Sequence, residues 1–182
     1  MSSLPAEGSS LERLRALLLD EGGLMASLVA PAAGTSDGID GPAQLAASGP
    51  RAEGHREDYQ LLIEAIYEGY LLHYGTPRVA FTTEADLALL AGDRLYALGL
   101  AHLVALGDTE AVVELADTIT LSALAQGAGA GELADAVWAA GARALGWGSS
   151  DAHRRAKDLA RAGAAEAIEA MRTSATGLSA SP

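Results

Sequence analysis

The sequence predicts an all-α protein, a compact bundle of about five to six helices. Alanine and leucine, which favour helices, dominate the composition, and aromatic residues make up only 4%. Apolar residues recur at spacings of three and four in several long stretches, the spacing of one helix face. A chain of 182 residues is long enough for one domain with its own core, so we expect a single helical domain over 1–182.

The first predicted helix runs over 10–29. A serine, Ser9 or Ser10, caps its start, and leucines recur behind it at spacings of three, four and seven. The glycine pair at 22–23 weakens this helix.

Three of the six prolines lie in the next segment, 31–57, which has no periodic apolar pattern. We therefore interpret it as a loop or flexible linker. A structureless connection of this length is unusual in a compact domain, so either a short helix forms near 43–47 or the segment is partly disordered. The small, polar tail 173–182 should be frayed.

Five further helices follow from the apolar periodicity and the capping residues. The first begins at Asp58 and ends at Gly75, just before Pro77. Their predicted ranges are 58–74, 84–106, 109–126, 131–145 and 150–172.

The stretch 84–106 organises the rest of the chain. Its leucines and alanines spread around nearly the whole helix, and a helix that is apolar all round is normally buried with neighbours on several sides. Its polar exceptions include Asp93, which must be paired or near water because burying a lone carboxylate is costly. Asp93 could bind a ligand, but we favour a structural polar role, in which Gly92 allows close approach of a hydrogen-bonding partner.

The formal net charge of −12 opposes non-specific binding to nucleic acid or anionic lipid. The four cations Arg154, Arg155, Lys157 and Arg161 are interleaved with acids, and we interpret them as the solvated face of a helix. The chain has no cysteine, so thiolate catalysis and cysteine-bound metals are excluded. We expect a cytoplasmic protein with no membrane span, since the first residues lack a signal-peptide pattern.

Three acids, Glu110, Glu114 and Asp117, share one helix face and could hold Mg²⁺, although a solvated face is the simpler interpretation. Of the histidines, His153 is expected at the surface. We predict no catalytic residue, no cofactor and no metal ligand.

The run 89–98, LLAGDRLYAL, resembles a segment of the trans-polyprenyl diphosphate synthases, helical enzymes that elongate isoprenoid chains. The stretch 66–79 is similar to the place where those enzymes carry their first aspartate-rich motif. The motif itself is missing, because this chain has no aspartate between Asp58 and Asp86, and the only acids after Asp58 in the predicted helix 58–74 are Glu64 and Glu68. Several converging carboxylates are needed to hold Mg²⁺ on a diphosphate.

Within that family, the chain most resembles the small, non-catalytic subunit of heterodimeric hexaprenyl and heptaprenyl diphosphate synthases, which also lacks the motif. The similarity covers about 59–126. It implies an isoprenoid-synthase-like fold and an accessory role that supports the activity or chain length of a catalytic prenyl synthase subunit. Four residues are then candidates for an interface or a prenyl-chain tunnel: Tyr67, Tyr70, Tyr96 and Leu100. The alternative is a self-associating helical scaffold or regulatory protein unrelated to isoprenoids.

Overall fold

The computed structural model describes residues 9–29 and 41–177, and within them the chain is all-α, as predicted. These residues form nine α-helices and one short 3-10 helix, which exceeds the expected five to six. They also contain an isolated antiparallel β-bridge between Val29 and Ala80. In chain order the elements are α1 Ser10–Glu21, α2 Gly23–Leu28, α3 Pro42–Ser48, η1 Pro50–Ala52, α4 Arg56–Tyr74, α5 Ala85–Ala105, α6 Thr109–Gly127, α7 Gly131–Trp147, α8 Asp151–Arg161 and α9 Ala167–Thr176.

Two of the predicted helices are each divided by a glycine, which explains most of the higher count. The helix predicted over 10–29 breaks at Gly22, whose φ of 69° lies in the region that L-residues rarely adopt. The helix predicted over 150–172 ends at Arg161, and Gly163 turns the chain with a φ of 62° before α9 begins.

The proline-rich segment contains a short helix, the first of the two alternatives considered. This helix is α3, and η1 follows it directly. Residues 31–40 of the expected linker lie outside the described residues. The expected frayed tail overlaps α9, which continues to Thr176, and 178–182 also lie outside the described residues.

The described residues group into two compact units, so the expectation of a single domain stays a prediction. Unit 1 takes its residues from Met1–Gln44 and His55–Leu106, and unit 2 from Leu45–Gly54 and Gly107–Pro182. Each unit has its own buried residues, and each is described by itself below.

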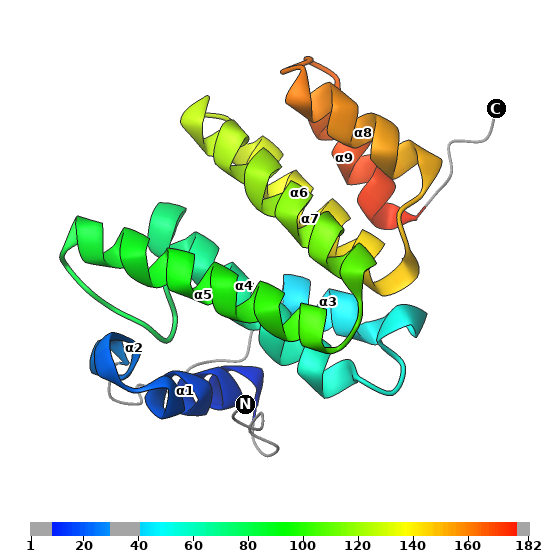
Figure 1. Cartoon of the computed structure of the whole chain (residues 1–182). Helices are drawn as coiled ribbons and strands as arrows, with labels where there is room; N and C mark the ends of the chain where they lie inside the picture. Colours follow the sequence, from blue (N-terminus) through cyan, green and yellow to red (C-terminus); the bar gives the residue numbers. More distant parts are fainter. Residues whose placement is uncertain (1–8, 30–40, 178–182) are drawn as a thin grey trace. The chain divides into compact units, whose positions relative to one another are not determined.

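In unit 1, α4 lies side by side with α5 and also contacts α1 (Figure 1). The two long helices approach closely at glycines: a Cβ added to Gly69 would lie 2.9 Å from the carbonyl oxygen of Gly92. Leucines of α1, α4 and α5 fill the core, among them Leu14, Leu61 and Leu95, all with no exposed surface. The side of α5 that faces α4 is therefore fixed by tight packing.

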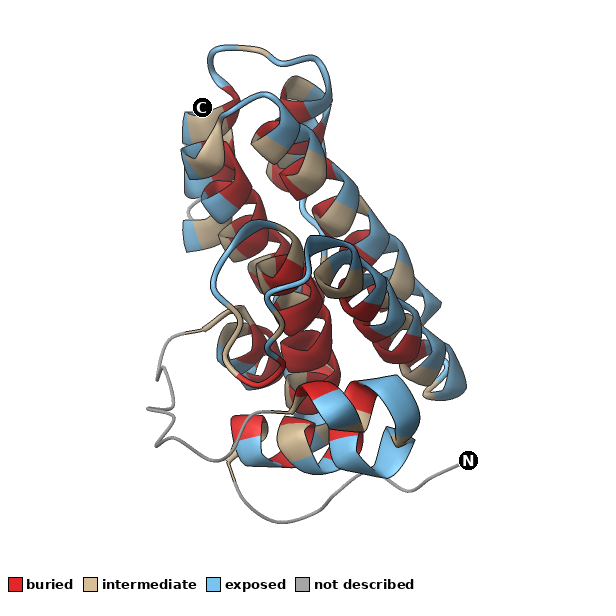
Figure 2. Cartoon of the chain, turned by 90° about the vertical axis from the view of Figure 1, so that its left-hand side faces the viewer, coloured by how far each residue is buried: buried red, intermediate tan, exposed pale blue. Residues whose placement is uncertain are grey.

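In unit 2, α7 lies between α6 and α9, and α8 contacts both α6 and α9. Figure 2, which colours the chain by burial, shows helices with buried residues along one side and exposed residues along the other. Small side chains, such as Ala134 and Ala156, and a few large ones, such as Leu115 and Met171, make this core. The alanine-rich sequence thus allows short distances between helices.

Candidate functional site

One side of α5 is apolar and open to solvent. The exposed fraction is 57% for Leu90 and 56% for Val104, and Leu89 is 48% exposed. Ala97 and Ala101 lie exposed between them. We call the six residues Leu89, Leu90, Ala97, Leu100, Ala101 and Val104 the apolar α5 face.

The prediction that this helix is buried on several sides is therefore wrong. Hydropathy around a helix reports which side chains are apolar, but it does not report which of them have neighbours. In unit 1 only the side of α5 that carries Leu95, Leu98 and Leu103 is buried.

Among the described residues, α5 is the one helix whose length and composition would allow it to cross a membrane, and a core helix can pass the same test. Its exposed side also carries Asp86, Asp93 and Arg94. Charged side chains are costly inside a bilayer, so these three residues favour contact with protein over contact with lipid.

The four predicted interface or tunnel residues lie in unit 1 at different depths. Tyr70 is buried, and its ring stacks on Tyr67 with the ring centres 5.8 Å apart. Tyr96 is half-buried beside the His73 ring, and burial raises the pKa of its phenol. Leu100, half-buried, belongs to the apolar α5 face.

Asp93 lies on the exposed side of α5, with 71% of its side chain accessible. Its carboxylate is 3.5 Å from Nε2 of His73, whose ring nitrogen also lies 3.0 Å from the Leu89 carbonyl oxygen. The sequence required Asp93 to be either paired or near water, and its exposure shows that it is in contact with water. Gly92 does allow the expected close approach, but the groups that come close are His73 and the backbone of Gly69.

Glu64 and Glu68 of α4 are bound by other residues of the chain itself. Glu68 is fully buried, and its Oε1 accepts hydrogen bonds from the backbone N–H groups of Arg78, Val79 and Ala80, at 2.7, 2.6 and 3.1 Å. The Arg78 guanidinium reaches both acids, donating to Glu64 Oε1 at 3.2 Å and to Glu68 Oε2 at 3.3 Å. These carboxylates anchor the segment before α5, a structural role.

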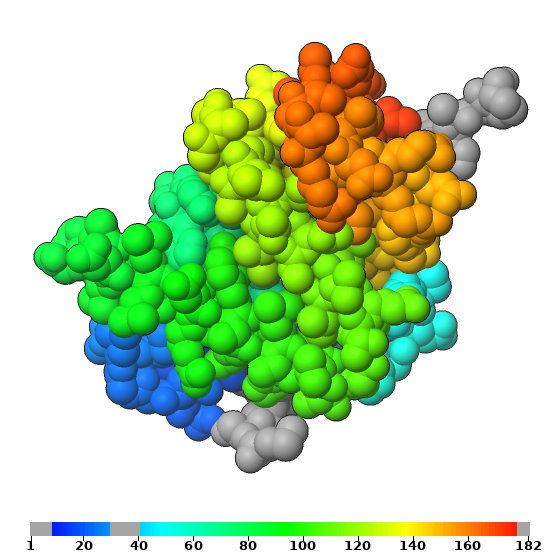
Figure 3. All heavy atoms as spheres, turned by 45° about the horizontal axis from the view of Figure 1, so that its top comes forward, coloured from blue at the N-terminus to red at the C-terminus, as the bar shows by residue number. Residues whose placement is uncertain are grey.

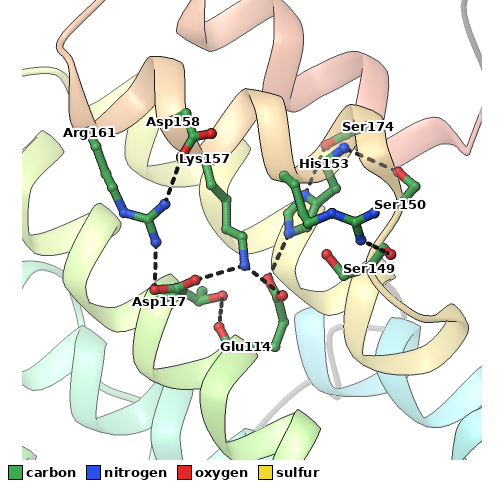
Figure 4. Close-up of polar contacts among 11 residues, drawn as sticks. Glu114, Asp117, Ser149, Ser150, His153, Lys157, Asp158, Arg161 and Ser174 are labelled. Atoms are coloured by element: carbon green, nitrogen blue, oxygen red, sulfur yellow. Dashed lines mark hydrogen bonds and ion pairs between the residues drawn. The ribbon is translucent and has the colours of Figure 1, made fainter.

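Unit 2 contains a second group of charges, the partly buried ion cluster, formed by Glu114 and Asp117 of α6 with His153, Lys157 and Arg161 of α8 (Figure 4). Lys157 is the only lysine of the chain, and 9% of its side chain is exposed. Its Nζ donates to Glu114 Oε2 at 2.8 Å and to Asp117 Oδ2 at 2.7 Å. Figure 3 shows the orange surface of α8 directly beside the yellow-green surface of α6. The cluster therefore fastens α8 to α6.

His153 extends the ion cluster to α9. Its Nε2 lies 2.6 Å from Glu114 Oε1, and its Nδ1 lies 3.2 Å from the hydroxyl of Ser174. Serine, histidine and glutamate together are the residue types of a hydrolase triad. The Ser174 hydroxyl, however, is buried and donates to the Met171 carbonyl oxygen, so it is placed as a helix contact and not as a nucleophile facing a substrate.

The charges of the ion cluster support one another. Burial by itself would raise the pKa of Glu114, but hydrogen bonds from His153 and Lys157 outweigh it and hold that pKa below its usual 4.5. Burial would likewise raise the pKa of Asp117, and hydrogen bonds from Lys157 and Arg161 hold it below 3.8. Burial would lower the pKa of Lys157, whereas the two carboxylates raise it above 10.5.

These contacts overturn three expectations from the sequence. His153 is buried instead of lying at the surface, and Lys157 does not belong to a solvated face. Of the acids of α6, Glu114 is buried and ion-paired, so the expected solvated face holds for Glu110, whose side chain is 79% exposed, but not for Glu114. A signal was present: residues 153, 157 and 161 recur every four positions, and so form a stripe that matches the acids of α6.

A pocket of about 500 Å³ opens beside the ion cluster in unit 2. The charged groups on its wall are already paired with one another or with nearby residues: Arg51 donates to Glu110 at 2.7 Å, and Lys157 to Glu114. Arg154 donates to the Ser149 carbonyl oxygen at 2.9 Å. No cluster of three or more potential metal ligands is found within 9–29 and 41–177. The pocket thus offers little unused charge to a ligand.

We expect unit 2 to lose stability in acid through these two carboxylates. A carboxyl group whose pKa is lower in the folded state stabilises the fold above its unfolded pKa, and this contribution is lost as the pH falls through the folded pKa. For Glu114 and Asp117 the loss should begin near pH 4.5 and continue below pH 3.8. Urea unfolding followed by circular dichroism between neutral pH and about pH 3 measures it.

The variant Glu114→Gln is the control for the acid series, because glutamine does not titrate. Its unfolding midpoint should be lower at neutral pH and should fall less on acidification. Equal acid dependence of the two proteins would contradict the assignment.

The described residues thus define an all-α protein with an exposed apolar helix face in unit 1 and a partly buried ion cluster in unit 2. When the chain is compared with protein-family models, with curated proteins and with solved structures, no match is found.

Proposed function

We propose that this chain is a non-catalytic helix-association protein, which acts by packing the apolar α5 face against a helix of another chain. The observation that carries the proposal is the exposure of Leu89, Leu90 and Val104 on one long helix. Apolar residues exposed singly are common, but several large ones exposed on one side of one helix favour an interaction surface.

The inner side of α5 supports the proposal, because it is held rigidly. The glycine contacts with α4 and the anchoring of the preceding segment by Glu68 fix the helix in unit 1. A helix whose position is fixed can present its outer side to a partner at little cost in conformational entropy. The charged residues of the ion cluster are paired with one another, so they stabilise the fold. This fits a protein that acts by binding another chain.

Two partners follow from the sequence. The resemblance of 89–98 to the polyprenyl diphosphate synthases suggests the catalytic subunit of such a synthase, and this chain would then be its accessory subunit. The composition alone suggests self-association. Both partners would use the same helix face, so one set of variants tests the association itself.

The test replaces Leu90 by lysine, which places a charge in the apolar α5 face. Sedimentation of the chain alone, and of its mixture with a synthase that carries both aspartate-rich motifs, measures association over a wide concentration range. We expect association in at least one arm, weakened at least about tenfold by Leu90→Lys. The matched control is Leu124→Lys on α6, because Leu124 is 55% exposed and lies outside this face.

The two variants separate a specific face from general stickiness. Equal weakening by Leu90→Lys and Leu124→Lys would contradict the proposal. A chain that stays monomeric in sedimentation and leaves the synthase's activity and product length unchanged would also contradict it.

A further inference from the structure

We infer that the apolar α5 face binds the same face of a second copy of this chain, with the two helices antiparallel and Ala97 at the two-fold axis. This inference rests on the proposed function and names its partner. The argument comes from the spacing, size and charge of the residues on the exposed side of α5.

The spacing is self-complementary about Ala97. Leu90 precedes Ala97 by seven residues and Val104 follows it by seven, which is nearly two helical turns in each direction. At about 100° per residue, both side chains point within about 20° of the direction of Ala97. A two-fold axis at Ala97 therefore brings Leu90 of each copy against Val104 of the other, as an isologous contact requires.

The size of the residues at the centre allows the helices to meet. Ala97 and Ala101 are exposed, and their methyl groups permit an interaxial distance near the lower end of the usual range of about 8–10 Å. The larger Leu90 and Val104, each more than half exposed, then fill the space on either side. Both residues become covered without any change in unit 1.

The charges select the antiparallel arrangement. The exposed residues Asp86, Asp93 and Arg94 all lie in the N-terminal half of the helix, whereas 97–105 contains no acidic residue, lysine or arginine. Antiparallel packing about Ala97 places Asp93 and Arg94 against positions 101 and 100 of the other copy, inside its uncharged stretch, and it also opposes the helix dipoles favourably. Parallel packing would place Asp93 against Asp93 and Asp86 against Asp86, which like-charge repulsion disfavours.

The contact is short, so the dimer should be weak. From Leu90 to Val104 the face is about 21 Å long, and a single helix pair of this length buries less than the roughly 1,200–2,000 Å² of a standard interface. We expect a dissociation constant on the order of 10 µM. The net charge of −12 opposes association of two copies, so raising the salt concentration from about 20 mM to about 300 mM should strengthen the dimer several-fold.

Single cysteines test the register directly, because the chain contains no cysteine of its own. Two facing Cα atoms at Ala97 would be about 4–6 Å apart, which a disulfide can bridge. Two copies of residue 90 would be about 21 Å apart along the antiparallel pair. In a glutathione buffer, Ala97→Cys should therefore form a disulfide dimer, and Leu90→Cys alone should not.

A mixture of Leu90→Cys chains with Val104→Cys chains should give the mixed disulfide. The control is Ala128→Cys, an exposed position after α6 that measures random collision. Self-cross-linking of Leu90→Cys as readily as Ala97→Cys would overturn the antiparallel register. Cross-linking of Ala97→Cys no faster than Ala128→Cys, with a monomer at about 200 µM, would overturn the dimer itself.

A monomeric chain without specific cross-linking at residue 97 would rule out the dimer but would not decide the proposed function. If a synthase then bound the chain and Leu90→Lys weakened that binding, the face would still be an interaction surface with a different partner. Loss of both arms would overturn the inference and the proposed function together.

Discussion

Replacing Glu68 by alanine should lower the free energy of unfolding of unit 1 by about 4 kcal/mol, the largest loss expected for one side chain of this unit. The substitution leaves the backbone N–H groups of Arg78, Val79 and Ala80 without their acceptor and removes the charge that holds the Arg78 guanidinium. Each buried donor left without a partner costs about 1–3 kcal/mol. Urea unfolding followed by far-ultraviolet circular dichroism measures the loss.

The variant Glu68→Gln grades this result, because its amide keeps one acceptor oxygen but places a donor towards the Arg78 side chain. It should lie between the natural protein and Glu68→Ala, and it remains measurable if the alanine variant does not fold. The matched control is Glu57→Ala on the same helix, since 73% of the Glu57 side chain is exposed and its carboxylate lies 3.9 Å from Arg13. It should cost less than about 1 kcal/mol. Equal losses at residues 57 and 68 would refute the anchoring role.

Replacing Lys157 by methionine should lower the stability of unit 2 by about 3 kcal/mol. Methionine keeps an unbranched apolar side chain, one atom shorter than that of lysine, but removes the ammonium group that Glu114 and Asp117 share. Two carboxylates, one of them buried, then lose the cation that they share and keep only His153 and Arg161 as partners, and breaking one side of a buried ion pair is costly. Thermal and urea unfolding of the full chain report this loss.

A double-mutant cycle separates the pairing from the loss of packing. Glu114→Gln and Lys157→Met should together cost at least about 1 kcal/mol less than the sum of their separate effects, because the second change removes a group that the first has already left unpaired. Arg154→Met on the same helix is the control, because the Arg154 side chain is 56% exposed and pairs only with exposed groups. Additive effects of the two cluster variants would show that Glu114 and Lys157 do not stabilise the fold through their mutual ion pair.

The helical class and most helix ends were predictable because they depend on neighbouring residues. The apolar spacing, Asp108 as the cap of α6, and Gly75 at the end of α4 are all local features. The break at Gly22 was only half predicted, because the sequence showed a weak point but not the backbone conformation that the packing of α1 and α2 requires. Gly163 was missed for the same reason.

The ion cluster was less predictable, because the residues that pair within it are distant in sequence. His153 and Lys157 meet Glu114 across 39 and 43 residues, and no local pattern states that two charged stripes face each other. Glu68 shows the same limit: its position in the sequence suggested a departure from a family motif, and only the fold shows that its carboxylate anchors the segment before α5.

The sequence by itself determined that this chain is helical, strongly acidic, and apolar nearly all round one long helix, since these properties follow from residue type and spacing along the chain. The tertiary structure decided which side of α5 is covered, and that Glu114 of α6 is buried and paired instead of solvated. Burial and ion pairing depend on which helices become neighbours, and packing between helices sets that choice.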